Sequence, residues 1–570
     1  MQELPTIFPT PKKIEFGEGY YKLPENAIRI DDSGMPMGDA VKVLQNPNFD
    51  DEEYELSIGD SGIVIVACNN KSVKLAFQTL RQILMQCKEL PYLKIHDFPD
   101  LPVRGFMLDI SRCKVPTMDT LLYLVDMLAL FKFNRLELYT EHTFAFRNHP
   151  LVWGDSSPMT PKEYKMLEGL CQKTGIELVA NINSLGHFDR WLRYEPYQPL
   201  AESKAPFTDP MGNVRPYPTT LCPDEKALNF IDSLYAEFLP LFASDKVNIG
   251  CDEPWELGMG KSKENCEKLG KYKVYTNYLN RLNGLVKKYN KRAYFWADVL
   301  MNDKPSVNDI PADMTPILWG YEADSPFEEQ CAYLKSLNRN FLVAPGTSCW
   351  NSFICRWQNA KANIENACKN AKKYEAQGAI LTNWGDNGNH QAFCGMYMQI
   401  ALFAQCAWSD TPYSQDEIID VASKLIFKDE TKNFARAIIT LANADPWNKQ
   451  YSLHNKLFFG SAEEVKKLAE ENSSALVKII RACDDALNQL KMSRPMCADA
   501  QICFAEIGLA MDMIRWAVNR SVSDKKTETT PQQIGLKLII GRFEQVWLAR
   551  ARVGGLYEAS TRIRNIKKLA

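Results

Sequence analysis

The chain has 570 residues, more than a single hydrophobic core usually contains, so we expect two or three domains, one of them large. Its formal net charge of -3 and the lack of a Lys/Arg-rich stripe with interleaved aromatic residues argue against nucleic acid as a partner. No apolar run approaches the ~20 residues that a helix needs to cross a bilayer, so a membrane is not an expected partner either.

Cysteine and histidine usage indicates a reduced protein without a metal. The 16 cysteines are scattered and many fall within apolar runs, so we expect buried thiols. The six histidines show no His-x-x-x-His spacing, so neither a catalytic metal nor another cofactor is expected. The start of the chain lacks the basic and apolar regions of a signal peptide. We therefore expect a cytoplasmic protein, or a periplasmic one if a signal peptide was removed from a longer precursor.

Residues 1–98 are expected to form a small non-catalytic α/β domain. Short apolar or alternating runs at residues 28–30 and 62–67 predict strands, and the amphipathic segment 72–86 predicts a helix. No chemistry-bearing cluster stands out in this part of the chain.

Residues 99–409 alternate between strand and helix patterns. Eight apolar runs predict strands, at residues 105–110, 135–139, 176–182, 247–249, 293–296, 316–319, 341–344 and 379–382. Helices are predicted between them, including residues 118–131 and one that starts with capping-box spacing at Thr160 and Glu163. This pattern predicts a (β/α)8 TIM barrel, although a doubly wound open sheet would give a similar one.

Strand patterns stop after residue 409, so we expect a C-terminal helical domain over residues 410–570. Helices are predicted at residues 415–427, 432–444, 462–490, 498–522 and 531–552, with a polar linker at 525–530. The methionine and aromatic positions of this domain are more typical of a core than of a functional site.

Polar and aromatic residues follow each predicted barrel strand directly. In strand order they are Arg112; Glu141 and His142; Asn183 and His187; Asp252 and Glu253; Trp296 and Asp298; Trp319 and Tyr321; Trp350; and Trp384 with Asp386. A contribution from every strand end favours a barrel, whose site is built from the loops at its C-terminal face. An open sheet would concentrate its site at one switch point.

Asp252 and Glu253 are adjacent carboxylates at the end of the predicted strand 247–249, which would hold both side chains in one cavity. Neighbouring acids titrate interdependently, so one can stay ionised while the other keeps its proton near neutral pH, as acid-catalysed bond cleavage requires. Taken alone, the pair has a simpler interpretation, in which Asp252 caps the next helix and Pro254 occupies its first position. The residues at the other strand ends decide against that interpretation.

Several tryptophans with a few carboxylates and one arginine are the usual composition of a sugar pocket, because aromatic faces stack on C–H surfaces while acids and arginine bind hydroxyls. Taken singly, each of these residues has a structural explanation. A tryptophan can close the end of the barrel core, His187 can be a structural histidine with its hydrogen bonds satisfied, and Arg112 can be the ion-pair partner of Asp109. Five aromatic residues and five acids at successive strand ends argue against coincidence.

Six motifs resemble, in their order, those of the glycoside hydrolase family 20 β-N-acetylhexosaminidases, with the closest likeness to the branch that contains hexosaminidase D. They are RGFMLDISR at 104–112, LYTEHTF at 138–144, NSLGH at 183–187, NIGCDE at 248–253 with LGMGK at 257–261, FWAD at 295–298 and TNWGD at 382–386. The resemblance extends from about residue 5 to 400 and includes that family's N-terminal module. The C-terminal helical part also resembles that branch, but this likeness is less distinctive.

The resemblance implies retaining, substrate-assisted, exo-acting hydrolysis of terminal β-linked GlcNAc or GalNAc, in which the sugar's own 2-acetamido oxygen attacks C1 to form an oxazolinium. It implies that Glu253 is the general acid/base and that Asp252 orients the acetamido nitrogen. For substrate binding it implies Arg112 and Asp386 at the outer hydroxyls, Trp296, Trp350 and Trp384 as walls, and Tyr321 as donor to the acetamido oxygen, with Glu141, His187 and Trp319 as further candidates.

Two positions depart from the family pattern. Cys251 stands before the acid pair where a small or apolar residue is more usual, and its side chain would narrow the pocket floor. Ala297 occupies a position where an acid is common, which leaves Asp298 without an assigned role.

Two other functions stay open from the residues. One is a conventional two-carboxylate glycosidase with Glu141 or Glu322 as nucleophile, and the other is a non-catalytic carbohydrate-binding barrel, against which the presence of both Asp252 and Glu253 argues. The expected partner is a glycan or glycoconjugate with a terminal N-acetylhexosamine, and the expected assembly is a monomer or homodimer.

Overall fold

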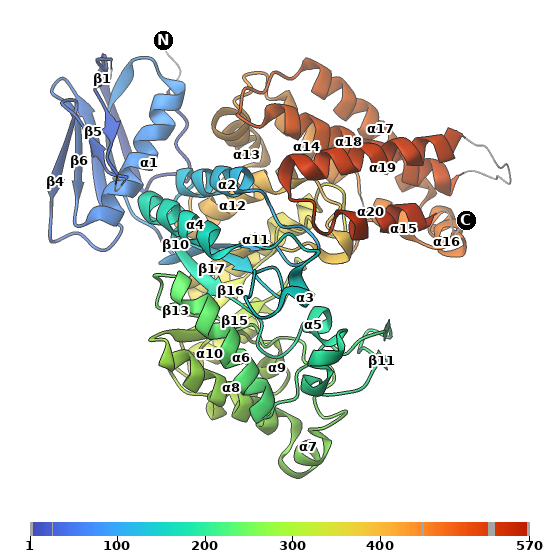
Figure 1. The fold of residues 1–570 in the computed structure, drawn as a ribbon. Helices are drawn as coiled ribbons and strands as arrows, with labels where there is room; N and C mark the ends of the chain where they lie inside the picture. Colours follow the sequence, from blue (N-terminus) through green and yellow to red (C-terminus); the bar gives the residue numbers. More distant parts are fainter. Residues whose placement is uncertain (1–3, 26, 33, 446–449, 523–530, 567–570) are drawn as a thin grey trace.

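The computed structural model has three parts, a sheet domain, a barrel and a set of C-terminal helices (Figure 1). It describes residues 4–25, 27–32, 34–445, 450–522 and 531–566. The predicted fold class, a (β/α)8 barrel with an N-terminal α/β domain and a C-terminal helical domain, is confirmed. The domain limits at residues 98 and 409 remain predictions, and the predicted linker at 525–530 lies outside the described residues. No helix in the described part of the chain is long and apolar enough to span a membrane.

The N-terminal domain is a five-stranded sheet with one helix packed on it. The strand order is β1-β7-β5-β6-β4, with β1 at Lys13–Tyr21, β4 at Val41–Gln45, β5 at Tyr54–Gly59, β6 at Gly62–Ala67 and β7 at Leu90–Asp97. The helix α1, Asn70–Gln86, begins at a capping box formed by Asn69 and Ser72. The predicted strand at 28–30 is instead β2, Arg29–Ile30, in a separate two-stranded sheet with β3, Pro36–Met37.

A buried ion pair joins the N-terminal domain to the barrel. Lys132 Nζ lies 2.8 Å from Asp97 Oδ2, and both side chains are fully buried. Trp408 donates its indole N–H to Asp97 Oδ1 (2.8 Å), and its ring is part of the N-terminal domain's core. Because each polar group of this cluster has a partner, the two domains can share a dry interface.

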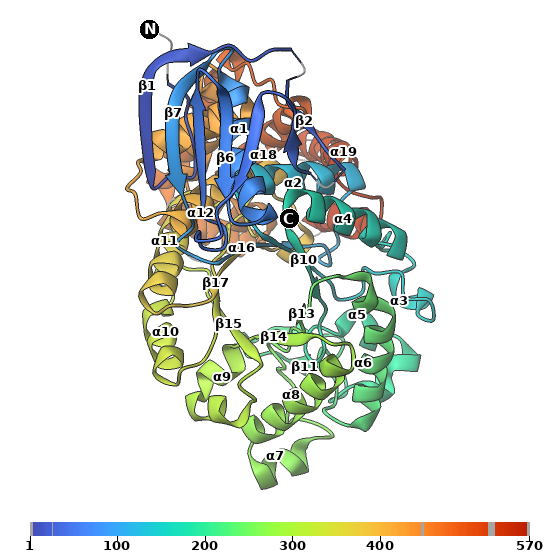
Figure 2. The same ribbon diagram turned by 90° about the vertical axis from the view of Figure 1, so that its left-hand side faces the viewer.

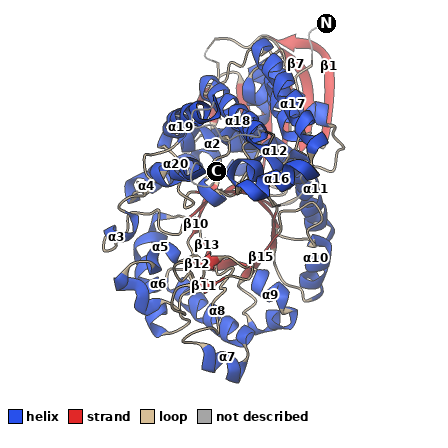
Figure 3. Ribbon diagram, turned by 90° about the vertical axis from the view of Figure 1, so that its right-hand side faces the viewer, coloured by secondary structure: helices blue, strands red, loops and turns tan. Residues whose placement is uncertain are grey.

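The barrel is closed and parallel, and all eight predicted strands are present. Its order is β10-β13-β14-β15-β16-β17-β8-β9, and Figures 2 and 3 show the ring of strands end-on from opposite sides. The strands are β8 Val103–Asp109, β9 Arg135–Tyr139, β10 Glu177–Asn181, β13 Lys246–Asn248, β14 Arg292–Trp296, β15 Thr315–Trp319, β16 Leu342–Ala344 and β17 Gly378–Asn383. Because both faces of such strands are buried, they appear in the sequence as short apolar runs.

Helices surround the ring of strands. They include α2 Met118–Leu130, α4 Pro161–Thr174, α6 Glu225–Phe238, α8 Lys271–Lys288, α10 Phe327–Ser336, α11 Trp357–Lys373 and α12 Tyr397–Trp408. The predicted capping box is present at the start of α4, where Thr160 and Glu163 each accept the other's backbone N–H. Loops and short elements that follow the strands form the C-terminal end of the barrel, where the candidate residues lie.

The C-terminal part is helical, as predicted, but its helices differ from the predicted ones in two ways. The elements are α13 Gln415–Val421, continued by a π-helical turn at Ala422–Phe427, then α14 Asn433–Asn443, α15 Leu453–Phe459, α16 Ala462–Glu471, α17 Ser473–Met492, α18 Ala500–Ser521, α19 Pro531–Arg550 and α20 Leu556–Asn565. The single helix predicted at 462–490 is wrong, because Asn472 interrupts it: its side-chain amide donates to the Leu468 carbonyl (2.8 Å), competing with the helical ladder. The helices α15 and α20 were not predicted.

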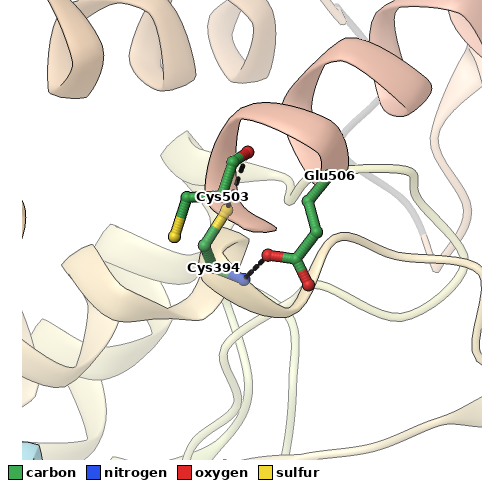
Figure 4. Close-up of side chains that lie close together, drawn as sticks. All are labelled: Cys394, Cys503 and Glu506. Carbon is green, nitrogen blue, oxygen red and sulfur yellow. Dashed lines mark hydrogen bonds between the residues drawn. The ribbon is translucent and has the colours of Figure 1, made fainter. Parts of the chain in front are cut away.

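The long helix α18 is anchored to the barrel through Glu506 (Figure 4). Its carboxylate accepts the backbone N–H groups of Phe393 (3.2 Å) and Cys394 (3.1 Å), which precede α12. Arg550 at the end of α19 neutralises the same carboxylate at 3.1 Å. This charge-assisted contact, fully buried, ties the C-terminal helices to the last segment of the barrel.

Candidate active site

The structure brings all eleven candidate residues together at the C-terminal end of the barrel strands. Arg112 follows β8, Glu141 follows β9, His187 follows β10, Asp252 and Glu253 follow β13, Trp296 ends β14, Trp319 ends β15 and precedes Tyr321, Trp350 follows β16, and Trp384 and Asp386 follow β17. Each contacts at least one of the others. His142, which also follows β9, has no hydrogen bond or ring contact with this set within the described residues.

The acid pair lies on a sharply turned backbone between β13 and β14. The φ angles of Gly250, Cys251 and Glu253 are 68°, 70° and 47°, a left-handed conformation that is unfavourable for the two non-glycine residues. A Cβ at Gly250 would meet Asn183 Oδ1 at 2.2 Å, so only glycine fits there. The next helix, α7, does not begin until Lys263, so the interpretation of Asp252 as its N-cap is wrong.

The surroundings of Glu253 favour its protonated form. Burial raises the pKa of its carboxyl, and the negative charge of Asp252 raises it further, while His187 and Arg112 oppose the shift. The sequence predicts that the neighbouring acid influences this titration, and in the structure burial is the larger cause of the shift. A raised pKa favours the protonated form of Glu253, which general acid catalysis requires.

His187 forms a hydrogen-bonded ion pair with Asp252. Its Nε2 lies 3.0 Å from Asp252 Oδ2 and 3.6 Å from Glu253 Oε2. Burial lowers the pKa of His187, but the attraction of Asp252 and its hydrogen bond outweigh that effect and raise it to about 9. His187 is therefore a cation at neutral pH. The other oxygen of Asp252, Oδ1, is buried and has no hydrogen-bond partner among the described residues.

Arg112 lies near Nδ1 of His187, whose Nε2 faces the acid pair, and it is surrounded by carboxylates. Its guanidinium lies 3.3 Å from Asp109, 3.3 Å from Glu141 and 3.8 Å from Asp386. It also lies 3.5 Å from His187 Nδ1. The predicted pairing with Asp109 is present, but the side chain remains 20% exposed and so can still bind a ligand's hydroxyls.

Aromatic rings form the remaining wall of the site. Trp319 and Tyr321 are stacked with centroids 5.2 Å apart, Tyr321 meets Trp350 edge-on at 5.2 Å, and Trp296 and Trp384 lie 6.1 Å apart. These rings belong to a hydrophobic cluster inside the barrel that is separate from the core between barrel and helices. They are therefore a lining of the site as well as a lid on the barrel interior.

Asp298 is a site residue to which the sequence assigned no role. Its Oδ2 accepts the backbone N–H of Glu253 (3.1 Å), and its Oδ1 lies 3.5 Å from the indole nitrogen of Trp319. Burial and the charge of Asp252 raise its pKa to about 8. In the sequence, Asp298 was marked by its position two residues after Trp296. No role followed from that position, because Ala297 stands beside it where the family commonly has an acid.

Cys251 does not narrow the pocket floor, contrary to the expectation. Its side chain is buried in the core between barrel and helices, with Sγ 3.4 Å from the Ile249 carbonyl. Its own carbonyl accepts the hydroxyl of Tyr275 on α8 (3.0 Å). The residue therefore supports the acid pair from behind.

Three groups of possible metal ligands occur in the described part of the chain, and their chemistry is unfavourable for a metal. In His187, Asp252 and Glu253, the raised pKa values of the histidine and the glutamic acid keep protons where a metal would need lone pairs. The other two groups share Cys503 with Cys394 and Glu506, or with Cys497 and Asp499. Figure 4 shows Cys394, Cys503 and Glu506 close together. Burial raises the pKa values of the Cys394 and Cys503 thiols, and Arg550 already neutralises Glu506.

Comparisons with known proteins agree with this geometry. A family model described as "Glycosyl hydrolase family 20, catalytic domain" matches residues 101–417, and one described as "Glycosyl hydrolase family 20, domain 2" matches residues 24–98. Among curated proteins, a beta-hexosaminidase of Akkermansia muciniphila is 27% identical over 37% of this chain and 47% of its own. Hexosaminidase D of Bos taurus is 23% identical over 35% of this chain and 59% of its own. The chain spans about half the length of most curated relatives it matches.

Solved structures share the fold. A β-N-acetylhexosaminidase of Bacteroides fragilis superposes with a TM-score of 0.60 at 19% identity, covering 74% of this chain and 95% of that one. A chitobiase of Flavobacterium johnsoniae also has a TM-score of 0.60, at 15% identity, and covers 99% of both chains. The second likeness therefore extends over the C-terminal helices.

Proposed function

Since this chain belongs to glycosyl hydrolase family 20, we propose that it is an exo-acting, retaining β-N-acetylhexosaminidase that releases terminal β-linked GlcNAc or GalNAc. The observation that carries the proposal is the pair Asp252 and Glu253. Asp252 is hydrogen-bonded to His187 through one oxygen and keeps the other free, and its neighbour Glu253 has a raised pKa.

The two carboxyls suit substrate-assisted hydrolysis. Glu253 donates its proton to the leaving oxygen while the sugar's acetamido oxygen attacks C1, and Glu253 then takes a proton from the water that opens the oxazolinium. Asp252 Oδ1 is free to accept the acetamido N–H, which orients the group and stabilises the positive charge that develops on it. No second carboxylate nucleophile is needed.

The remaining residues fit the binding of one terminal sugar. The guanidinium of Arg112 is placed for the outer hydroxyls together with Asp386, which lies 3.8 Å away. Trp296, Trp350 and Trp384 are placed as walls around ring and acetamido group, and the Tyr321 hydroxyl as donor to the acetamido oxygen. These roles are proposed from the geometry and from the family's motifs.

The two-carboxylate alternative is weakened by the partners of its candidate nucleophiles. Glu141 lies 3.3 Å from the guanidinium of Arg112, and Glu322 lies 3.0 Å from that of Arg356. Arg112, the partner of Glu141, lies 3.5 Å from His187, which in turn lies 3.6 Å from Glu253. Inhibition by a thiazoline that mimics the oxazoline would be expected only for the substrate-assisted mechanism.

A panel of chromogenic β-glycosides tests the function. We expect release of chromophore from the β-GlcNAc and β-GalNAc glycosides and none from the β-glucoside, which lacks the acetamido nucleophile. Comparable turnover of the glucoside would exclude substrate assistance. Absence of turnover of every glycoside by folded protein would favour a carbohydrate-binding barrel.

For the compartment, we propose the cytoplasm or another reducing environment. All 16 cysteines are unpaired and most are buried. Oxidised protein isolated from its native source would contradict this.

A further inference from the structure

Tyr139 is a buried residue that contacts several side chains of the site but has no role in the mechanism described above. It is the last residue of β9, which lies between β8 and β10 in the ring of strands. Its side chain is 0% exposed, so a sugar bound in the site does not touch it. Any effect of Tyr139 on the reaction must therefore pass through the residues around it.

The ring of Tyr139 supports three side chains of the sugar site. The guanidinium of Arg112 lies over the ring, 4.5 Å from its centroid. Trp384 meets the ring edge-on with centroids 4.8 Å apart, and His187 does so at 6.4 Å. Because an aromatic face attracts a cation, the ring helps to hold Arg112 in the site.

The hydroxyl of Tyr139 fixes Glu141. It donates to Glu141 Oε1 (3.0 Å), the same oxygen that lies 3.3 Å from Arg112 Nε. Burial raises the pKa of Tyr139 well above its usual value of 10, so the hydroxyl keeps its proton at neutral pH and remains a donor. Since two donors converge on one oxygen of Glu141, the hydroxyl also determines where Glu141 meets Arg112.

The same hydroxyl fixes the amide of Asn183. It accepts an N–H from Asn183 Nδ2 (2.7 Å), and Asn183 is itself 1% exposed. The other end of that amide packs on Gly250, where an added Cβ would lie 2.2 Å from Asn183 Oδ1. The amide therefore connects Tyr139 to the backbone turn that leads into Asp252 and Glu253.

A second amide holds the same turn from the strand side. Asn248, the last residue of β13, accepts the N–H of Gly250 on its Oδ1 (3.0 Å) and donates from Nδ2 to Glu137 (3.1 Å). The carbonyl of Gly250 accepts the backbone N–H of Trp296 (3.0 Å). With Asn183 packed on its Cα as well, Gly250 has little room to move while that amide stays in place.

We propose that Tyr139 is a positioning residue that couples the two halves of the site. Through its ring and hydroxyl it places Arg112 and Glu141, and through Asn183 it places the turn that carries the acid pair. The proposal rests on the proposed function, because it assigns to one residue an effect on sugar binding and on the reacting bond. Tyr139 itself forms no bond to the substrate and exchanges no proton with it.

Tyr139→Phe tests the proposal, because it keeps the ring and removes only the hydroxyl. With a chromogenic β-GlcNAc glycoside we expect KM to rise about threefold or more, through Glu141, and kcat to fall roughly 10- to 100-fold, through Asn183. A folded variant with both constants within about twofold of the wild type would make Tyr139 purely structural. A change confined to one of the two constants would overturn the coupling.

Tyr397→Phe is the matched control. Tyr397 at the start of α12 is also 0% exposed, and its hydroxyl also donates to a carboxylate, that of Asp499 before α18 (2.7 Å). This variant should lower the melting temperature about as much as Tyr139→Phe and leave kcat and KM within about twofold of the wild type. An equal loss of activity in both variants would trace the effect to lost stability and overturn the proposal.

Double variants locate the coupling. If the hydroxyl acts on the acid pair through Asn183, adding Tyr139→Phe to Asn183→Ala should lower kcat by less than about twofold further. Adding it to Glu141→Gln should likewise raise KM by less than about twofold further. Losses that multiply would overturn the proposal. Should Tyr139→Phe not fold, Asn183→Ala alone still decides, since an unchanged kcat in that variant would contradict the link to the acid pair.

A crystal structure of Tyr139→Phe separates this proposal from the proposed function. If the wild-type protein cleaves no glycoside, the proposed function fails, and the structure of the variant still decides the positioning role. The amide of Asn183 and the carboxyl of Glu141 should be rotated away from their places in the wild-type protein. Both side chains in unchanged positions would overturn the proposal.

Discussion

Asp298 accepts the backbone N–H of Glu253 at 3.1 Å, and so fixes the left-handed backbone from which the proposed general acid projects. With Trp319 close to its other oxygen, Asp298 joins the acid pair to the aromatic wall. It is therefore expected to position Glu253 without touching the substrate.

Asp298→Ala should lower kcat on the order of 10- to 100-fold with little change in KM, because small misplacements of a catalytic group have effects of that size. Asp298→Asn should retain most activity at pH 6, since an amide oxygen can still accept the N–H of Glu253, and since a pKa of about 8 leaves the native carboxyl protonated there. Steady-state kinetics and melting temperatures of both variants check this. A folded Asp298→Ala protein with wild-type kcat would contradict a positioning role.

The pH profile should depend on His187. Glu253 acts as an acid in its protonated form, so activity is lost as pH rises through its raised pKa, which places the alkaline limb of kcat/KM above the ordinary value of 4.5. The positive charge of His187 lowers that pKa. His187→Gln removes the charge, and the alkaline limb should move to higher pH while the maximal rate falls. Profiles from pH 4 to 9 measure this, and a shift to lower pH would show that His187 does not act on Glu253.

Arg112→Ala should raise KM strongly, because no other residue replaces a bidentate guanidinium at two hydroxyls. The structure adds a second effect, since Asp109 and Glu141 would lose their counter-ion and the melting temperature should fall. Arg112→Lys separates the two effects: it should recover most of the melting temperature and little of the binding. Unchanged kinetics in folded Arg112→Ala would make the residue purely structural.

The barrel and its site could be predicted because their signals are local. Each strand is a short apolar run, and each functional residue stands within a few positions of a strand end, as Trp296 and Trp384 do. Parallel strands of a closed barrel then bring those ends together whatever their separation in sequence.

The pocket between the barrel and the C-terminal helices could not be predicted because it depends on contacts between distant segments. Asn455 lies on α15, a seven-residue helix too short to give a clear period, and it lines the same pocket as Asn351 only after the C-terminal helices have packed. The break at Asn472 was missed for a similar reason, since the apolar pattern continues across it. The helix α16 ends there because the backbone of Asn472 leaves helical angles (φ -123°, ψ 25°) and its side-chain amide donates to the Leu468 carbonyl. The role of Asp298 likewise depends on a backbone N–H that no pattern displays.

The acid pair gives the most discriminating prediction, because its two members act on different parts of the substrate. Glu253→Gln should lose most activity on substrates with poor leaving groups and much less on activated aryl glycosides, since general-acid help is worth roughly 10²–10⁴-fold and matters least where the leaving group needs no proton. Asp252→Asn should reduce the rate on both substrates alike, because its free Oδ1 serves the acetamido group, whose attack precedes any question of the aglycone. The ratio of kcat/KM between an activated and an unactivated substrate should therefore rise in the first variant and stay constant in the second.

Melting temperatures serve as the control for folding, and His187 gives an independent check, since His187→Gln should resemble Asp252→Asn in its leaving-group dependence. Equal ratios in both carboxyl variants, or wild-type rates in either folded protein, would show that the roles assigned to Asp252 and Glu253 are wrong.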